Sequence, residues 1–168
     1  MKKISNTPMY TCTVDTPLGA MIACAQQDAL MGLWFIEEQR FLPDHSGWTE
    51  SDAPVFAALR AWLRAYFAGR KPDATPCLHP QGSDFRRVVW DTLLRIPYGH
   101  TTTYGELADT LRKHGAAQAV GGAVGHNPIS LIIPCHRVVG AKGRLTGYGG
   151  GLERKKALLA LERWARFE

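Results

Sequence analysis

The stretch NPISLIIPCHRV, residues 127–138, ends a run of apolar side chains on an adjacent cysteine and histidine. The run at 129–133 is short and almost wholly apolar, which predicts a buried β-strand, and Pro134 removes a backbone donor at its end. A free cysteine is usually an inert, buried side chain. A thiol beside an imidazole is also typical of a nucleophile with its base, because His136 can take the proton of Cys135 directly or through a water. The dipeptide alone leaves both interpretations open.

Residues on both sides of this stretch add the polar groups that a reactive site requires. Asn127, in an Asn-Pro turn, can hydrogen-bond nearby backbone through its side-chain amide. Downstream, residues 147–151 (GYGGG) form a loop whose backbone N–H groups can point at a ligand. The spacing over 152–165 predicts a closing helix, on which Glu162 lies one turn after Leu158 and can face inward. An inward carboxylate holds an imidazole in one tautomer and raises its basicity.

Upstream, the sequence predicts a mostly helical region that contains a helix-turn-helix. A helix over 85–95, capped by Asp84, is followed by TYGE at 103–106, a capping box that begins a second helix. His-Gly at 114–115 ends this helix, and a third begins over 116–124. Two helices joined by a short glycine-containing turn are typical of a helix-turn-helix, although any helical hairpin has a similar pattern.

The helix at 116–124 (AAQAVGGAV) has almost no charge and almost no large side chain. Its two internal glycines each cost about 1 kcal/mol relative to alanine. A recognition helix in a major groove would carry Arg, Asn or Gln on several turns. Small side chains instead allow close approach, either of another helix or of a narrow minor groove, and the residues leave both possibilities open.

The N-terminal half predicts a small α/β domain. Residues 10–15 alternate apolar and polar, and 20–25 and 31–36 predict two more strands, which together form an antiparallel meander. Residues 52–68 carry an apolar stripe at helical spacing, and Gly69 is placed to end that helix. We identify no chemistry in this half.

Composition separates the two halves. Residues 69–83 contain three prolines and two glycines, which predicts a linker between an α/β domain at 1–78 and a second domain at 79–168. Residues 1–80 hold 7 basic and 8 acidic side chains, whereas 81–168 hold 13 and 7. A basic half suits a polyanionic partner such as nucleic acid, although a merely solvated basic surface gives the same count.

Localisation and metal content are predicted by what the sequence lacks. Met-Lys-Lys begins the chain, but no apolar segment follows at 4–10, and no apolar run approaches the ~20 residues of a membrane span, so we expect a cytoplasmic protein with no membrane partner. No CxxC spacing signals a disulfide framework or a zinc ribbon among Cys12, Cys24, Cys77 and Cys135. Cys12, Cys24 and Cys77 could converge on a metal together with His79, but their spacing does not favour a metal site. We expect no metal and no cofactor.

The residues around Cys135 resemble the O6-alkylguanine-DNA alkyltransferases. The similarity rests on Asn-Pro at 127–128, on IPCHRV at 133–138, on Tyr104 upstream and on YGG at 148–150. It is strong across residues 83–165 and weaker in the N-terminal half, where it includes TPLG at 16–19. The resemblance implies DNA repair. These proteins flip an O6-alkylated guanine out of the duplex from the minor-groove side and move the alkyl group irreversibly onto their own cysteine, once per molecule.

Carried over by position, the resemblance makes Cys135 the alkyl acceptor and His136 its base through a bridging water, with Glu162 orienting the imidazole. Asn127 would brace the active-site loop. Tyr104 would donate to a ring nitrogen of the flipped base and help to rotate the nucleotide. The expected partner is alkylated double-stranded DNA bound by a monomer, and O4-alkylthymine is left open as a second substrate.

The resemblance also implies a set of substrate-binding and DNA-binding residues: Tyr104, Gln118, Ala119, Gly121, Gly122, Arg137, Val138, Tyr148 and Gly149. In this set the Val138 carbonyl and the Gly149 N–H would meet the exocyclic edges of guanine, and Arg137 would hold nearby loops through its fork of donors. Gln118 stands where the family usually has an arginine that enters the base stack. Glutamine lacks the charge and the guanidinium plane, which affects the expected efficiency on duplex DNA but not the expected fold or transfer.

Two other functions remain open at this stage. A cysteine protease of the Cys-His-Asn kind would use Asn127, but protease triads are assembled from residues distant in sequence, whereas Cys135 and His136 are adjacent. A non-catalytic module that only marks lesions would resemble this chain but would lack the cysteine. Methylation of the protein by O6-methylguanine DNA separates the three functions.

Overall fold

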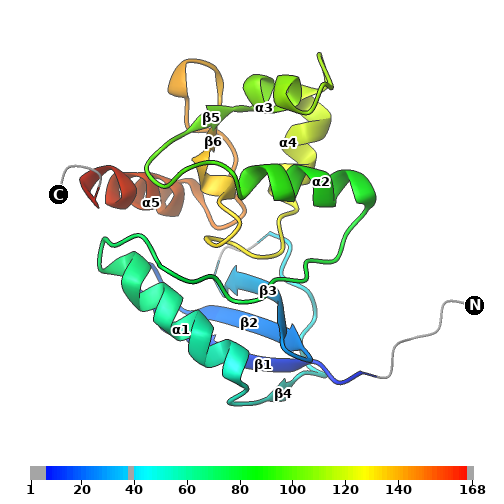
Figure 1. The fold of residues 1–168 in the computed structure, drawn as a ribbon, viewed down its shortest axis with the longest axis vertical. Coiled ribbons are helices and arrows are strands. Elements are labelled where there is room, and N and C mark those ends of the chain that lie inside the picture. Colours follow the sequence, from blue (N-terminus) through cyan, green and yellow to red (C-terminus); the bar gives the residue numbers. More distant parts are fainter. Residues whose placement is uncertain (1–6, 38–39, 166–168) are drawn as a thin grey trace, which may run out of the picture.

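A computed structural model describes residues 7–37 and 40–165, and it has two stacked layers (Figure 1). The N-terminal layer is a sheet with one helix, and the C-terminal layer is mostly helical, which confirms the predicted fold class. Within the described residues, no helix is both long enough and apolar enough to cross a membrane.

The sheet contains the predicted meander and one further strand. Strands β1 (Tyr10–Val14), β2 (Met21–Gln26) and β3 (Ala29–Phe35) pair antiparallel in sequence order. Strand β4 (Thr49–Glu50) pairs parallel with β1, so the sheet is mixed and its order is β3-β2-β1-β4. The sequence did not predict β4 because two residues are too few to display a period-two pattern.

Both faces of the sheet are covered. On one face Met21, Ala23 and Ala25 of β2 belong to the main core, which also contains the apolar face of α1. On the other face Ile22 and Cys24 pack with Trp34 of β3 in a smaller cluster. Strand β2 is buried along nearly its whole length, and this explains why its sequence lacks polar alternation.

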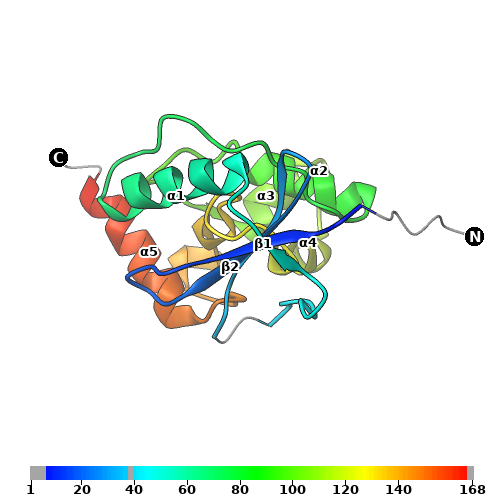
Figure 2. The ribbon, with the colours of Figure 1, turned by 90° about the horizontal axis from the view of Figure 1, so that it is seen from below.

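Helix α1 (Pro54–Phe67) runs along the sheet, as Figure 2 shows from below. Proline occupies the first turn, where its missing N–H has no intrahelical acceptor in any helix. The helix ends where Gly69 takes a positive φ of 78°, as predicted. Its buried side chains lie at helical spacing: Val55, Phe56, Leu59, Trp62, Leu63 and Tyr66.

The free edge of β3 holds the C-terminal layer. Leu30 exchanges backbone hydrogen bonds with Cys77 and His79, each at 2.8 Å, so the segment between the layers is tied to the sheet. Leu33 donates to the Pro128 carbonyl at 2.8 Å and accepts from the Ser130 N–H at 3.0 Å. An edge strand has unpaired backbone groups, and here both segments satisfy them.

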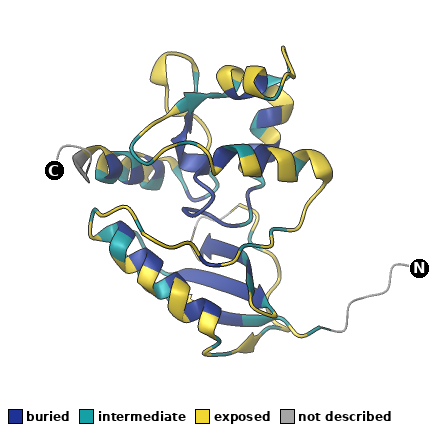
Figure 3. Cartoon of the chain, viewed as in Figure 1, coloured by how far each residue is buried: buried dark blue, intermediate teal, exposed yellow. Residues whose placement is uncertain are grey.

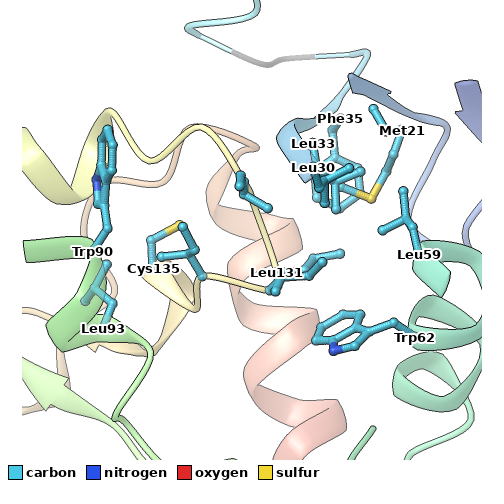
Figure 4. Packing of buried hydrophobic residues seen from close by; sticks show 14 of the residues in the cluster. Met21, Leu30, Leu33, Phe35, Leu59, Trp62, Trp90, Leu93, Leu131 and Cys135 are labelled. Carbon is cyan, nitrogen blue, oxygen red and sulfur yellow. The ribbon is translucent and has the colours of Figure 1, made fainter. Parts of the chain in front are cut away.

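The apolar run at 129–133 is not a strand, so that prediction was wrong. Only Ile129 forms a bridge, to Leu33, and the chain then turns tightly, with Leu131 at a positive φ of 71° and the Ile133 N–H bonded to the Ile129 carbonyl at 3.1 Å. The run is apolar because residues 129–133 are buried between the two layers. Figure 4 shows Leu131 reaching toward Trp62, with Cys135 on the side of Trp90. Burial on all sides produces the same composition as a central strand.

The helices of the C-terminal layer agree with the predicted ones to within about two residues, except that α3 ends at Thr110, earlier than the predicted stop at 114–115. They are α2 (Asp84–Leu93), α3 (Tyr104–Thr110), α4 (Ala117–Gly125) and α5 (Leu152–Ala165). The predicted capping box is present, because Thr103 accepts from the Glu106 N–H and Glu106 accepts from the Thr103 N–H.

Three details of this layer differ from the prediction or were not predicted. The N-cap of α2 is Ser83, which accepts from the Arg86 N–H, and not Asp84, whose carboxylate bonds Arg87 instead. Strands β5 (Thr102–Thr103) and β6 (Val138–Val139) form a short parallel pair. Two 3₁₀ turns, η1 (Cys135–Arg137) and η2 (Ala141–Gly143), flank β6.

The two layers share one hydrophobic core. Figure 3 shows buried residues concentrated where the layers meet, in the sheet and in the loop that leads to η1. Leu131, Ile133 and Val138 from the C-terminal layer join Trp62 and Leu33 from the N-terminal layer in this cluster.

Removing the Leu131 side chain should therefore weaken the whole protein. We expect Leu131→Ala to lower the free energy of unfolding by about 2–5 kcal/mol, since Leu131 is fully buried and the backbone around it is fixed by hydrogen bonds. Leu152→Ala, at a leucine that is 46% exposed, should change it little. Urea denaturation measures both, and equal effects of the two variants would contradict the interlayer role of Leu131.

Candidate active site

A pocket opens where the two layers meet, and Cys135 forms part of its wall. The pocket brings together six of the residues singled out in the sequence: Tyr104, Gly121, Asn127, Cys135, Tyr148 and Gly149. It also contains Arg40 and Phe41 of the N-terminal layer, which the sequence gave no reason to select. The Arg40 N–H donates to the Gly149 carbonyl at 3.2 Å, which ties the two sides of the mouth together.

Cys135 opens the 3₁₀ turn η1 and is 8% exposed. Burial raises the pKa of its thiol above the ordinary 9.0. A hydrogen bond from the Asn127 side chain, the charge of Lys155 and nearby backbone N–H groups act in the opposite direction. The thiol therefore stays protonated at rest near neutral pH, and it requires a base to become a nucleophile.

Asn127 fixes the loop that carries Cys135. Its amide nitrogen donates to the Ile133 carbonyl at 2.7 Å, and its amide oxygen accepts from the Ile129 N–H at 3.0 Å. Both bonds are buried, so one side chain closes the turn from each end. This arrangement presents the thiol at a fixed position in the pocket.

His136 lies behind the cysteine and is fully buried. Its Nε2 is 2.7 Å from Oε1 of Glu162, and the structure shows no described hydrogen-bond partner for its Nδ1. An ionised carboxylate can only accept a hydrogen bond, so Nε2 carries the hydrogen and Nδ1 keeps its lone pair. Burial lowers the pKa of His136, although Glu162 raises it in part. The ring is a neutral base near pH 7.

Glu162 of α5 is a buried carboxylate with several donors around it. Arg137 forms a bidentate ion pair with it: Nε donates to Oε2 at 2.9 Å, and Nη2 donates to Oε1 at 2.9 Å. Burial alone would raise the pKa of Glu162, but hydrogen bonds from His136 and Arg137 and their charges lower it to about 2. The hydroxyl of Tyr66, on α1, donates to Oε1 at 2.9 Å.

Arg137 points inward. Besides Glu162 it bonds the Ile96 carbonyl through Nη1 at 2.9 Å, and it is 8% exposed. Val138 is fully buried in β6, where it pairs with Thr102. Neither residue lines the pocket, and the contacts of Arg137 with Glu162 and Ile96 agree with a structural role for its side chain.

Lys155 is a residue that the sequence analysis missed. Its side chain is fully buried, and its ammonium donates to the carbonyls of Thr146 at 2.8 Å and Gly147 at 3.2 Å. Burial lowers its pKa to about 8, and the negative charge of Cys135, when this residue is a thiolate, acts in the opposite direction. The available signal was its spacing, since residues 155, 158 and 162 share one face of α5.

The loop from Thr146 to Gly151 forms one side of the pocket. Lys155 holds its first residues, and the hydroxyl of Tyr148 is buried without a described partner. A side chain at Gly150 would come within 2.9 Å of Phe35, so glycine permits the loop to lie directly on the sheet. The loop thus contributes Tyr148, with its buried hydroxyl, to the lining of the pocket.

The exposed face of α4 begins beside this pocket. Gln118, Ala119 and Gly122 are exposed, and Gly122 has open space where a side chain would extend. Gly121 instead faces the ring of Tyr104. These four residues do not converge on the thiol, and only Gly121 lines the pocket.

The geometry does not match a Cys-His-Asn protease. In such a triad the asparagine orients the imidazole, but here Asn127 bonds backbone and the cysteine, and Glu162 orients His136. No three His, Cys, Asp or Glu side chains of the described chain gather as a possible metal site.

Comparisons with known proteins cover nearly the whole chain. Residues 84–164 match the family described as 6-O-methylguanine DNA methyltransferase, DNA binding domain, and residues 9–75 match its ribonuclease-like domain. A methylated-DNA–protein-cysteine methyltransferase of Mycolicibacterium paratuberculosis is 49% identical over 151 residues, which are 90% of each chain. A protein with the same description from Methanosarcina acetivorans is 39% identical over 92% of this chain and 98% of its own.

Solved structures agree with these relatives. The crystal structure of Mycobacterium tuberculosis OGT in complex with DNA matches with a TM-score of 0.85 at 45% identity, over 93% of this chain and 94% of that one. The M. tuberculosis O6-methylguanine methyltransferase alone matches equally well, with a TM-score of 0.85 at 46% identity. Sequence and fold therefore lead to one conclusion: the chain belongs to the 6-O-methylguanine DNA methyltransferase family.

Proposed function

We propose that Cys135 is the residue through which this protein repairs alkylated DNA, by accepting the alkyl group of O6-alkylguanine. The family and its relatives are methylated-DNA–protein-cysteine methyltransferases, and this chain is an enzyme of that kind. The observation that supports Cys135 is its place in the pocket wall, directly beside the buried pair of His136 and Glu162.

The transfer is a single displacement at the alkyl carbon. The bond from the Cys135 sulfur to that carbon forms as the bond from the carbon to O6 of guanine breaks, and the electron pair leaves with the base. The thiol proton goes to Nδ1 of His136, directly or through a water, and guanine takes up a proton at a ring nitrogen, with Tyr104 as the donor we propose. Proton exchange with solvent then restores neutral His136 and the Tyr104 hydroxyl, so one proton moves in total from the thiol to the base. The product is a thioether, which has no acidic hydrogen and is a poor leaving group, so each molecule acts once.

The base has to leave the duplex before it can reach the thiol. Extrusion costs a few kcal/mol, which contacts with the DNA must offset. The small, exposed residues Ala119 and Gly122 of α4 permit close approach to a minor groove, and Gln118 is exposed on the same helix. In the pocket, the hydroxyl of Tyr148, which has no described partner, and the backbone N–H of Gly149 are the groups we propose for contact with the base. The Val138 carbonyl, which does not line this pocket, stays a prediction from the resemblance.

The arrangement of the whole chain follows from the same proposal. We propose the predicted division into an α/β domain over 1–78 and a domain over 79–168 that binds DNA and accepts the alkyl group, with the linker at about 69–83. Residues 1–6, 38–39 and 166–168 of these ranges lie outside the described residues. We propose that the protein acts as a cytoplasmic monomer. It requires no metal or cofactor, because the reaction needs only the thiol, its base and the damaged DNA.

The acceptor is tested by mass spectrometry. Incubation with O6-methylguanine DNA should add one methyl mass, on Cys135, because only this cysteine adjoins a base. Cys135→Ser should add none and should still bind DNA. Cys77 is the internal control, since it is exposed and more accessible but has no such base. Multiple turnover, or a methyl group on Cys77 or Cys12, would contradict the proposal.

The role of Glu162 is tested with Glu162→Gln, compared with Glu153→Gln at an exposed position of the same helix. The amide cannot stabilise a protonated His136, so transfer should slow and the pKa of Cys135 should rise, while DNA binding persists. The variant also leaves Arg137 buried without its carboxylate, which should cost about 3–5 kcal/mol of stability.

Acid should reduce the difference in stability between the wild type and Glu162→Gln. The pKa of Glu162 is about 2 in the folded protein, against an ordinary 4.5, so its contribution is present above pH 4.5 and is lost as the pH falls toward 2. The shift corresponds to about 3 kcal/mol. Denaturation of both proteins at several pH values measures it, and a difference that is constant between pH 6 and pH 2 would remove Glu162 as its source.

Gln118→Arg should speed the repair of duplex DNA. An arginine can stack in the gap left by the flipped base and attract phosphates, and both effects exist only when a duplex is opened. Binding should depend more steeply on salt, because one more charge displaces counterions. Reaction with a free O6-benzylguanine base should be almost unchanged. Rates on both substrates at two salt concentrations test this, and equal acceleration of both would mean that residue 118 acts on the thiol.

A further inference from the structure

We propose that Tyr66, on helix α1 of the N-terminal layer, is a positioning residue for the transfer: its hydroxyl holds the Glu162 carboxylate in the orientation that fixes His136. The inference rests on the role proposed above for His136 and Glu162. It assigns a part in the reaction to the half of the chain in which the sequence indicated no chemistry.

The geometry is a closed triangle of three buried groups. The Tyr66 hydroxyl lies 2.9 Å from Oε1 of Glu162, and Nε2 of His136 lies 2.7 Å from the same oxygen. The third side, from the hydroxyl to Nε2, is 3.4 Å. Tyr66 and His136 are fully buried and Glu162 is 1% exposed, so water does not compete for these bonds.

The direction of each hydrogen bond follows from the chemistry of the three groups. Glu162 is ionised and only accepts, so the single proton of the Tyr66 hydroxyl points at Oε1. Burial raises the pKa of Tyr66 far above its ordinary value, and the charge of Glu162 raises it further, so the hydroxyl remains a donor at every pH at which the protein functions. The lone pairs of its oxygen are then directed toward the N–H edge of His136. The other tautomer of His136, with its proton on Nδ1, would have no N–H at Nε2 to donate to Oε1 of Glu162 or to the Tyr66 oxygen.

The Tyr66 ring cannot readily leave this position. It stacks on Trp62 at 5.2 Å between ring centroids and meets Phe67 and Tyr98 edge-on at 5.3 and 6.1 Å. The three groups come from three different elements: Tyr66 from α1, Glu162 from α5 and His136 from η1. The relay is complete only when the two layers are docked.

The hydroxyl also moderates the charge that His136 experiences. A hydrogen bond donated to Oε1 withdraws negative charge from it. Without that bond the carboxylate should stabilise a protonated His136 more strongly. The carboxylate itself would be less firmly oriented, so it would fix the position of the imidazole ring less well. The charged groups that act on this triangle from the surrounding elements are Arg137 of η1 and Lys155 of α5. The ring of Tyr98 meets Tyr66 edge-on, but its hydroxyl makes no described hydrogen bond to any of the three groups. Among the described contacts, Tyr66 is the only residue of α1 that donates a hydrogen bond to Glu162, so no other side chain of that helix can replace it.

The test compares Tyr66→Phe with Tyr98→Phe. Each variant removes one hydroxyl from the same aromatic cluster, but the Tyr98 hydroxyl is buried without a described hydrogen-bond partner. Single-turnover rate constants for methyl transfer from O6-methylguanine DNA are measured from pH 5 to pH 9. The amount of protein methylated at completion counts the folded molecules, so a variant that merely folds poorly changes that amount and leaves the rate constant and its pH profile unaltered.

We expect Tyr66→Phe to slow transfer about tenfold, the scale of one buried hydrogen bond to a charged group. The midpoint on the acid side of its pH profile should rise by about half a unit, because His136 becomes easier to protonate. Tyr98→Phe should match the wild type in both. An unchanged rate constant in Tyr66→Phe, an unchanged or lower midpoint, or the same change in both variants would overturn the inference.

Failure of this inference is distinguishable from failure of the proposed function. If the wild type carries its methyl group on Cys135 and Tyr66→Phe reacts normally, only the role of Tyr66 is overturned. If the wild type is methylated at another residue, the relay itself is wrong and the inference falls with it.

Discussion

A single buried carboxylate, that of Glu162, organises the site. A buried negative charge is unfavourable unless it is paired and hydrogen-bonded. Arg137 supplies the opposite charge, and His136 and Tyr66 supply further donors. These partners come from η1 and α1, while Glu162 itself comes from α5. The electrostatic requirement of one group therefore holds three distant segments of the chain together, and the orientation of His136 is a consequence of it.

The position of the thiol depends on a second constraint, the unpaired edge of β3. Leu33 donates a hydrogen bond to the Pro128 carbonyl and accepts one from the Ser130 N–H, and these two bonds place the loop that Asn127 then closes. Cys135 follows directly on this loop and reaches the pocket between the layers. The N-terminal layer thus contributes twice, through the sheet edge that positions the nucleophile and through Tyr66, which contacts its relay.

Much of this arrangement could be predicted from local sequence. The capping box at Thr103 and the spacing on α5 are short-range patterns, and Cys135 and His136 are adjacent, so each was recognisable without tertiary information. Tyr66 was not, because on α1 it occupies a position of the apolar stripe and has the pattern of a core aromatic. The run at 129–133 was misassigned for a related reason, since burial between two layers and burial within a sheet select the same side chains. Lys155 was overlooked because a lysine on a helix is usually solvated.

The central claim is that Glu162 and its partners hold His136 as a neutral imidazole with its proton on Nε2. The ¹⁵N chemical shifts of the imidazole nitrogens measure this directly, with His136→Asn used to assign the signals among the six histidines. At pH 7 the account predicts a protonated Nε2 and an unprotonated Nδ1, and both signals should be insensitive to small changes of pH. A proton on Nδ1 with a bare Nε2, or two protonated nitrogens at pH 7, would contradict it.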